Sequence, residues 1–440
     1  MSGTPEAPAA RSHFVDLTPF RVSPAYFRMW LGASIAGIGA QMTLVAVGLH
    51  IYALTGDTGA VALVGVIGLL PIIIAGLYGG VLADTFDRRT VALLAETAAW
   101  LSVIGLAVLA WLHIDELWMY YALTTVNAVS VTIVGAARQA IVPRLLPPEL
   151  LPAAGALGGI SIGFQVIVGP AIGGVLVALV GVQWTYTVDA VLFLAAFTGL
   201  LTLPKIIPEG STGKVGFGAV ADGLRFLRTA PNIRMTFIID IIAMTFGQPR
   251  VLMPAVGALV IGGGAITVGI LSSAFAAGVV LSSVFSGRLG GVRHHGRAVR
   301  NAVLAYGGFI LLFGLVLLPL GSKASGSVVD SLANANILAL VLAAVALVGA
   351  GGSDNVSAVF RSTMLQAAVP DHMRGRMQGI FIVVVTGGPR IGDAYVGLVA
   401  ATALIWLPPV LGGVLIIGLV AWLVAASARF RAYDSLAPTP

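Results

Sequence analysis

Ionisable side chains stand inside or beside long apolar stretches of this sequence. A charge in such a setting is costly unless it is paired or reaches water, so it indicates a proton or substrate pathway. Asp189 and Arg250 are ionisable residues of this kind, and for Asp189 we prefer a role as an interhelical hydrogen-bond partner. His50, near the outer end of the first span, is interpreted as an interfacial residue. The candidates for a proton or substrate site are Glu96, Asp240, Asp354, Arg361, Arg390 and Asp393.

The spacing of these residues leaves structural alternatives open. Arg390 and Asp393 are three residues apart, so on one helix face they would neutralise one another. Asp354 and Arg361 are seven apart and also share a face. Asp354 follows the run Gly349-Ala350-Gly351-Gly352, where we expect the helix to be loosened enough to expose backbone to a cavity. Both a transport role and a purely structural role stay open for these two pairs.

Several other kinds of chemistry are disfavoured by composition and spacing. The chain has no cysteine, which excludes disulfides, thiolate zinc sites and thiol catalysis. Its six histidines form no His-Glu-x-x-His pattern, and the segment 210–215 lacks the glycine spacing and the closing Ser or Thr of a phosphate-binding loop. The sequence therefore predicts no enzyme activity, no metal site and no cofactor.

Composition indicates a membrane protein. Hydrophobic residues make up 58% of the 440 residues, charged residues only 10%, and the mean hydropathy is +1.00. Counted in apolar runs of about 20 residues, the chain is predicted to be an all-α polytopic membrane protein with twelve transmembrane helices. The expected spans are Trp30–Leu54, Val61–Ala83, Val91–Leu112, Leu117–Ala137, Pro152–Val180, Val182–Leu203, Ile233–Ile261, Thr267–Val284, Ala298–Leu320, Ile337–Val359, Met377–Ala403 and Leu407–Ser427.

The distribution of basic residues predicts the orientation of these spans. All but three of the 24 Lys and Arg lie at the two ends of the chain or in or beside alternate connections. Cytoplasmic loops retain such residues, so both termini are predicted to be cytoplasmic in a multi-pass protein of the cell inner membrane. In a chain this apolar, the basic excess faces anionic membrane lipid, and no nucleic-acid partner is expected. No cleavable signal is expected in the first 28 residues, because they carry charges and no isolated short apolar run.

The longest polar interruption divides the chain into two halves. The predicted organisation is a cytoplasmic tail at 1–29, a six-helix bundle at 30–203, a cytoplasmic linker at 204–232, a second six-helix bundle at 233–427 and a tail at 428–440. In the linker, the spacing of Phe217, Val220, Leu224 and Leu227 predicts a short amphipathic helix at the membrane surface.

A weak internal repeat indicates that the two halves are related. Arg138 is followed nine residues later by Pro147 and then by the run Gly169 to Gly174. Arg361 is followed nine residues later by Pro370 and then by the run Gly388 to Asp393. Parallel repeats of this kind place the substrate between the halves, near the membrane midplane.

The loop between the second and third predicted spans, Gly80-Val81-Leu82-Ala83-Asp84-Thr85-Phe86-Asp87-Arg88-Arg89, resembles the signature loop of the major facilitator superfamily. It departs from the commoner pattern at Thr85 and Asp87. The Asp-Arg-Arg ending, the stretch 361–366, the run 370–376 and the Gly-Gly-Pro-Arg stretch at 387–390 are similar to the branch of bacterial exporters that contains the enterobactin exporter and drug-efflux proteins. The resemblance extends over nearly the whole chain.

This resemblance implies a monomeric carrier with alternating access, in which Gly80, Asp84, Arg88 and Arg89 form a gate; a topology lock is the structural alternative. Gly169, Pro170, Gly173 and Gly174 resemble the helix motif of the superfamily's antiporters, which favours export. The expected cargo is a small amphipathic molecule, a siderophore or a lipophilic drug, moved against protons. A proton- or ion-coupled uptake symporter and a non-transporting receptor are the alternatives.

Overall fold

The computed structural model describes residues 16–207, 225–284, 292–320, 335–369, 371–400, 404–437 and 439. A few side chains inside helices, including those of Asp84 and Asp371, lie outside this description. Within the described residues every regular element is a helix, and eleven segments are long and apolar enough to cross a membrane. The chain is an all-α polytopic membrane protein, as its composition predicts.

The first half of the chain forms six long helices after the short helix α1 (Thr18–Val22). Each begins and ends within a few residues of an expected span, except that α5 is eight residues longer at its carboxyl end. The six are α2 (Pro24–Thr55), α3 (Thr58–Thr85), α4 (Arg88–Trp111), α5 (Leu117–Leu145), α6 (Leu151–Val180) and α7 (Val182–Leu201).

The second half repeats this arrangement after the linker. Its long helices are α9 (Pro231–Phe246), α11 (Gly264–Val284), α12 (His295–Leu317), α13 (Ile337–Ala368), α14 (Asp371–Ala400) and α15 (Leu407–Ala426), and the short α16 (Ala428–Arg431) follows. The expected span Met377–Ala403 corresponds to α14, whose internal charges make it less apolar than the other eleven. The expected twelve spans are therefore all represented by helices.

Local sequence explains the tight connection between α2 and α3. Gly56 ends α2 with a φ of +64°, a left-handed conformation that glycine adopts without strain. Asp57 then caps α3, because its carboxylate accepts hydrogen bonds from the backbone N–H groups of Gly59 at 2.8 Å and Ala60 at 3.2 Å. Two residues thus reverse the chain at the membrane surface.

The seventh span is broken, whereas the sequence predicted one continuous helix over Ile233–Ile261. After α9 the chain leaves the helix at Gly247, and it resumes as the 3-10 turn η2 (Arg250–Leu252), α10 (Met253–Ala255) and the π-helix η3 (Val256–Val260). Pro249 has no backbone N–H and disrupts the hydrogen-bond ladder here. The freed carbonyl of Gly247 accepts a hydrogen bond from Tyr306 Oη at 2.6 Å, which compensates for the break.

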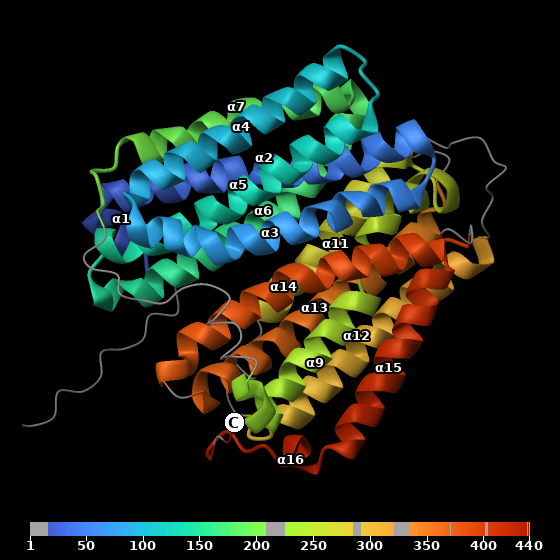
Figure 1. The fold of residues 1–440 in the computed structure, drawn as a ribbon. Helices are drawn as coiled ribbons and strands as arrows, with labels where there is room; N and C mark the ends of the chain where they lie inside the picture. Colours follow the sequence, from blue (N-terminus) through green and yellow to red (C-terminus); the bar gives the residue numbers. More distant parts are fainter. Residues whose placement is uncertain are drawn as a thin grey trace, which may run out of the picture.

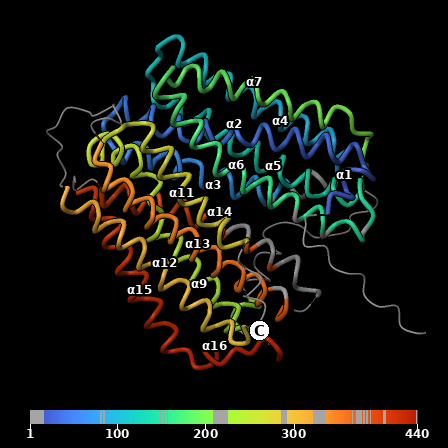
Figure 2. Tube along the Cα trace, turned by 180° about the vertical axis from the view of Figure 1, so that it is seen from behind, coloured from blue at the N-terminus to red at the C-terminus, as the bar shows by residue number. Residues whose placement is uncertain are grey.

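The two halves lie against each other along two helix pairs, α3 with α14 and α6 with α11 (Figures 1 and 2). At the end of the molecule away from α1 and α16, which we call the far end, the two halves lie side by side. They diverge toward the terminal end, where α1 and α16 lie (Figure 1). One large buried cluster includes residues of both halves, among them Tyr120 and Tyr186 of the first and Phe313 of the second. Other buried clusters are confined to a single half, such as the one around Tyr306 in the second.

Two local predictions meet different outcomes. The expected linker helix falls mostly outside the described residues: of its four apolar positions only Leu227 is described, and it is buried in the core of the second half. The expected loosening of the helix before Asp354 is wrong, since α13 is continuous from Ile337 to Ala368. Its glycines serve close packing instead, with Gly349 against the Phe309 ring and Gly351 against the backbone of Phe275.

Candidate transport cavity

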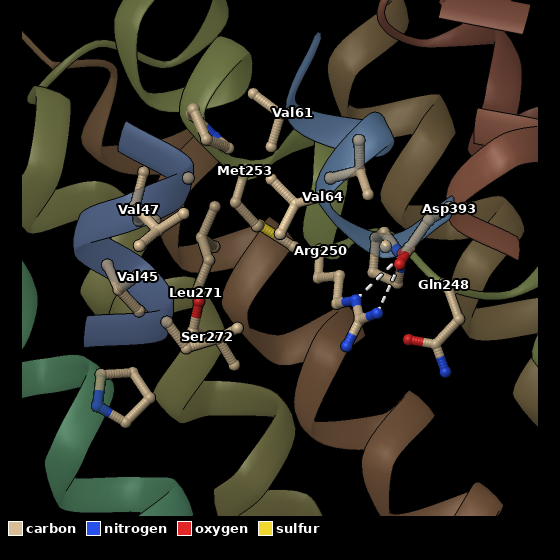
Figure 3. A pocket seen from close by; sticks show the side chains of 18 of the residues that line it. Val45, Val47, Val61, Val64, Gln248, Arg250, Met253, Leu271, Ser272 and Asp393 are labelled. Carbon is tan, nitrogen blue, oxygen red and sulfur yellow. Dashed lines mark hydrogen bonds and ion pairs between the residues drawn. The ribbon is translucent and has the colours of Figure 1, made fainter. Parts of the chain in front are cut away.

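A cavity of about 320 Å³ lies between the two halves, toward the far end. Its walls come from α2, α3 and α6 of the first half and from the broken seventh span, α11 and α14 of the second. Most of the lining is apolar, as the side chains of Val45, Val61, Val64 and Leu271 show in Figure 3. The cavity therefore suits a largely apolar molecule with a few polar groups.

The break in the seventh span positions Arg250 toward Asp393 of α14 (Figure 3). The guanidinium donates from Nε to Oδ1 at 3.0 Å and from Nη2 to Oδ2 at 2.5 Å, so both carboxylate oxygens are engaged. Asp393 is 2% exposed. The alternative in which Arg390 neutralises Asp393 is therefore wrong, because the partner of Asp393 comes from a different helix.

This ion pair lies at the contact between the halves. Gly65 of α3, in the first half, is so close to Asp393 that a Cβ added there would overlap Oδ2 and lie 2.9 Å from Cγ. Gly397, one turn further along α14, packs similarly close to Ala62 of α3. Glycine at position 65 is thus what allows the carboxylate and the first half to meet.

Arg390 also lines the cavity and is partly buried. Within the described part of the chain it has no hydrogen-bond or ion-pair partner, and the charged groups that act on it are Arg250 and Asp393. The sequence singled out Arg390 and Asp393 together, and the structure brings both to the cavity in different roles. The sequence placed Arg250 inside a span but did not predict its pairing with Asp393; its position one residue after a proline was the available signal of a break.

A second group of charges lies deep in the second half, away from the cavity lining. Asp240 of α9 forms an ion pair with Arg361 of α13, and the exposed fractions of the two residues are 4% and 8%. Asp354, two turns earlier on α13, interacts electrostatically with both. The group contains two carboxylates and one guanidinium, so one carboxylate lacks a full counter-charge.

The remaining acids predicted from the sequence are placed in the first half. Glu96 of α4 forms an ion pair with Arg138 of α5 at 3.0 Å and is 3% exposed. Asp189 of α7 is fully buried and accepts a hydrogen bond at 2.5 Å from Thr43 of α2. Its other oxygen, Oδ1, has no hydrogen-bond partner within the described residues. Neither acid lines the cavity.

His50 packs against aromatic side chains of the first half, and the charge of Asp115 acts on it. It is buried near the far end of α2, its ring lies edge-on to Tyr120, and its Nδ1 is 3.3 Å from the hydroxyl of Tyr186. These contacts give His50 a packing role inside the first half.

The signature loop is held by contacts of its basic end. Arg88 donates from Nη1 to the carbonyl of Ala140 at 2.8 Å, and Arg89 donates from Nη2 to the carbonyl of Leu201 at 2.8 Å. Both acceptors belong to the first half. The side chain of Asp84 lies outside the description, so the proposed gate among Gly80, Asp84, Arg88 and Arg89 stays a prediction.

Asp87, which the sequence presented only as a departure from the common pattern, has the clearest role in this loop. Its Oδ1 accepts from the backbone N–H of Ile206 at 2.7 Å and from that of Arg89 at 3.3 Å, and its Oδ2 accepts from Thr90 Oγ1 at 2.7 Å. Burial raises the pKa of Asp87, but the hydrogen bonds together lower it by more than burial raises it. The net shift of the pKa is therefore downward. Asp87 thus caps α4 and ties the loop to the start of the linker. Aspartate before an apolar helix was a readable capping signal.

The antiporter-like motif on α6 packs against both halves. Gly169 lies against Gln41 and Gly173 against Met42 of α2, where an added Cβ would overlap or crowd the backbone. Gly174 faces the other way and meets Ala265 and Gly269 of α11. Pro170 lines the cavity. The motif therefore permits the close approach of α6 to both neighbours, and α6 continues through Pro170 to Val180.

A family model described as transmembrane secretion effector, of the major facilitator superfamily, matches residues 15–440. The chain belongs to this family of transmembrane secretion effectors. Among curated proteins, the enterobactin exporter EntS of Salmonella typhi is 28% identical over 426 residues, which cover 95% of this chain and 96% of the relative.

Solved structures of other transporters share the fold of this chain. A POT family transporter in complex with 5-aminolevulinic acid superposes with a TM-score of 0.72 at 11% identity, covering 93% of this chain and 97% of that one. The inward-open xylose transporter XylE from E. coli superposes with a TM-score of 0.65 at 12% identity, with coverages of 93% and 97%. These superpositions show that the chain has the major facilitator fold. Its family and its curated relatives make it a multi-pass membrane transporter.

Proposed function

We propose that this chain is a secondary active exporter of small amphipathic molecules, such as siderophores or lipophilic drugs, and that it works by proton-coupled alternating access. Export is favoured by the family description and by the relative named as an exporter. The printed cargo of that relative, enterobactin, makes a siderophore one candidate cargo class for this chain.

The observation that carries this proposal is the cavity between the halves. It is bounded by both bundles. The halves touch beside it at close glycine contacts, Gly65 and Gly397 in the pair α3 with α14 and Gly174 in the pair α6 with α11. In alternating access, such contacts close one side of the binding site and are exchanged for contacts on the other side. The present arrangement corresponds to a state that is closed at the far end.

The buried charges of the second half are the best candidates for proton coupling. Asp354 interacts electrostatically with Arg361 on its own helix, with Asp240 of α9 and with Tyr306 on α12. With two carboxylates sharing one guanidinium, uptake of a single proton leaves the group neutral. We assign Asp354 as the carrier, with Asp240 and Arg361 as its fixed partners.

The sidedness and organisation of the exporter complete the proposal. The terminal end faces the cytoplasm of a cell with the protein in its inner membrane, and segments 30–203 and 233–427 are the moving halves joined by the linker 204–232. The signature residues Gly80, Asp84, Arg88 and Arg89 contribute to the gate at the terminal end. A monomer contains the complete cavity, so no second copy is required.

The test is cargo-dependent proton movement in sealed vesicles that contain the purified protein and a pH-sensitive dye. A proton gradient, acidic inside, is imposed, and siderophores and lipophilic drugs are added one at a time. We expect addition of cargo to alkalinise the interior faster in wild type than in vesicles with Asp354→Asn. Asp115→Asn, which changes an exposed acid in the connection between α4 and α5, is the matched control and keeps the response.

Each outcome has a separate meaning. A response that survives Asp354→Asn unchanged refutes the assignment of the carrier but not export. Proton movement in the same direction as the cargo identifies the uptake symporter. No response to any cargo, from protein shown to be folded, refutes proton coupling.

A further inference from the structure

The charges that line the cavity do not balance. The lining contains two arginines, Arg250 and Arg390, and one carboxylate, Asp393, so its formal net charge is +1. Arg250 engages both oxygens of Asp393 and forms a neutral pair with it. The excess positive charge therefore belongs to Arg390.

The surroundings of Arg390 leave its charge poorly compensated. The like charge of Arg250 opposes it, and the nearby carboxylate of Asp393 is already occupied by hydrogen bonds from Arg250. A guanidinium in a membrane-embedded, largely apolar cavity is costly without a counter-charge. An anionic group on a ligand supplies that counter-charge, and the planar donors of arginine match the geometry of carboxylate, sulfonate and phosphate oxygens.

The remaining walls indicate what else such a ligand must carry. Val45, Val61, Val64 and Leu271 form an apolar surface, and Gln41 and Gln248 supply neutral amide groups. Figure 3 shows the side chain of Gln248 on the same side of the cavity as the Arg250 and Asp393 pair. A molecule that satisfies both parts has an apolar body and one anionic group.

We propose that the cavity selects anionic amphiphiles and that Arg390 is the residue that recognises their negative charge. The inference rests on the proposed export function and narrows its cargo class. Arg250 is a positioning residue in this scheme, because it neutralises Asp393 and so prevents that carboxylate from cancelling the charge of Arg390.

The test uses two fluorescent probes with one ring system, anilinonaphthalene sulfonate and uncharged anilinonaphthalene. Binding is measured with the full chain in phosphatidylcholine nanodiscs, and the signal of empty nanodiscs is subtracted. Wild type is expected to bind the anionic probe more tightly than the neutral probe. We expect Arg390→Gln to weaken binding of the anion about tenfold or more, since one charged contact is lost, and to leave the neutral probe within about twofold.

Three further variants keep the result interpretable. Arg390→Lys retains the charge and is expected to recover most of the anion's affinity. Gln248→Glu adds a carboxylate to the same lining without touching Arg390, and it should weaken binding of the anion alone. Arg429→Gln removes an exposed arginine from α16 and should change neither probe. Thermal unfolding shows whether each variant is folded. If Arg390→Gln does not fold, Gln248→Glu still tests the proposal.

The outcomes separate this inference from the proposed function. If both probes bind equally and the charge variants alter neither, or alter both alike, the recognition role of Arg390 is refuted while amphiphile binding stands. If the neutral probe binds and the anionic probe does not, the cavity excludes anions and the proposed selection of anionic amphiphiles is refuted. If neither probe binds folded protein, amphiphile transport through this cavity fails and the inference fails with it.

Discussion

Replacing Gly65 by alanine should shift the protein away from the state closed at the far end. The added Cβ would overlap Oδ2 of Asp393 and lie 2.9 Å from its Cγ, and Asp393 is held in place by two hydrogen bonds from Arg250. Either the ion pair moves or α3 separates from α14. Overpacking of this kind costs about 1 to 3 kcal/mol, which corresponds to a shift of roughly 5- to 150-fold between two conformations.

A matched control is available on the same helix. Gly68 lies one turn further along α3, and a Cβ added there would meet only the side chain of Ile72, at 3.4 Å. Gly68→Ala therefore makes the same chemical change, with the same gain in helix propensity, but without the clash across the halves. The difference between Gly65→Ala and Gly68→Ala isolates the effect of the contact between halves.

The absence of cysteine from the sequence makes the assay direct. Spin labels on cysteines introduced at Glu116 and Ile337, both exposed, report the separation of the halves at the far end; labels at Lys205 and Arg429, also exposed, report it at the terminal end. Distance distributions from pulsed electron paramagnetic resonance should show a new longer component at the far end and a new shorter one at the terminal end for Gly65→Ala. Unchanged distributions, or equal changes in Gly68→Ala, would refute the reasoning.

Three other predictions concern separate parts of the molecule. Gly174→Ala should shift the same distance distributions, because the added Cβ would overlap the α11 backbone. Gly159→Ala on the same helix should not shift them, because its added Cβ would lie in open space. Equal distributions for the two variants would contradict the role of α6 in the contact between the halves. Arg361→Met should lower the free energy of unfolding by about 3 to 5 kcal/mol, because it leaves the buried carboxylate of Asp240 without its ion-pair partner. A loss no larger than that caused by replacing the exposed Arg429 would contradict this prediction. Hydrogen bonds from Arg293 lower the pKa of Asp434 from 3.8 to about 2. Protection of the carboxyl-terminal tail from proteolysis should therefore be constant from pH 8 to 5 and be lost as the pH falls from 3.8 through about 2. The Asp434→Asn variant should lose this protection at all pH values, and a loss between pH 8 and 5 in wild type would contradict the prediction.

The sequence alone determined the number and approximate bounds of the spans. Hydropathy is sufficient for this because the membrane requires each crossing segment to be apolar and to satisfy its own backbone hydrogen bonds. The exceptions are local. The break at Gly247 to Pro249 was readable in principle from the proline, and the cap at Asp87 from its position before α4. The glycines before Asp354 were misinterpreted, because glycine permits both a loosened helix and a tightly packed one.

Only the tertiary structure decided which charges meet. Spacing on one helix suggested that Arg390 neutralises Asp393, but the carboxylate pairs with Arg250, 143 residues away. In the same way Asp240 pairs with Arg361 from another helix, and only Arg390 is left facing the cavity without a partner in the described part of the chain. The sequence shows that a charged side chain lies within a membrane span and therefore needs a counter-charge. Which residue supplies that counter-charge depends on how helices distant in the sequence pack. That packing is not encoded in the periodicity of any single helix.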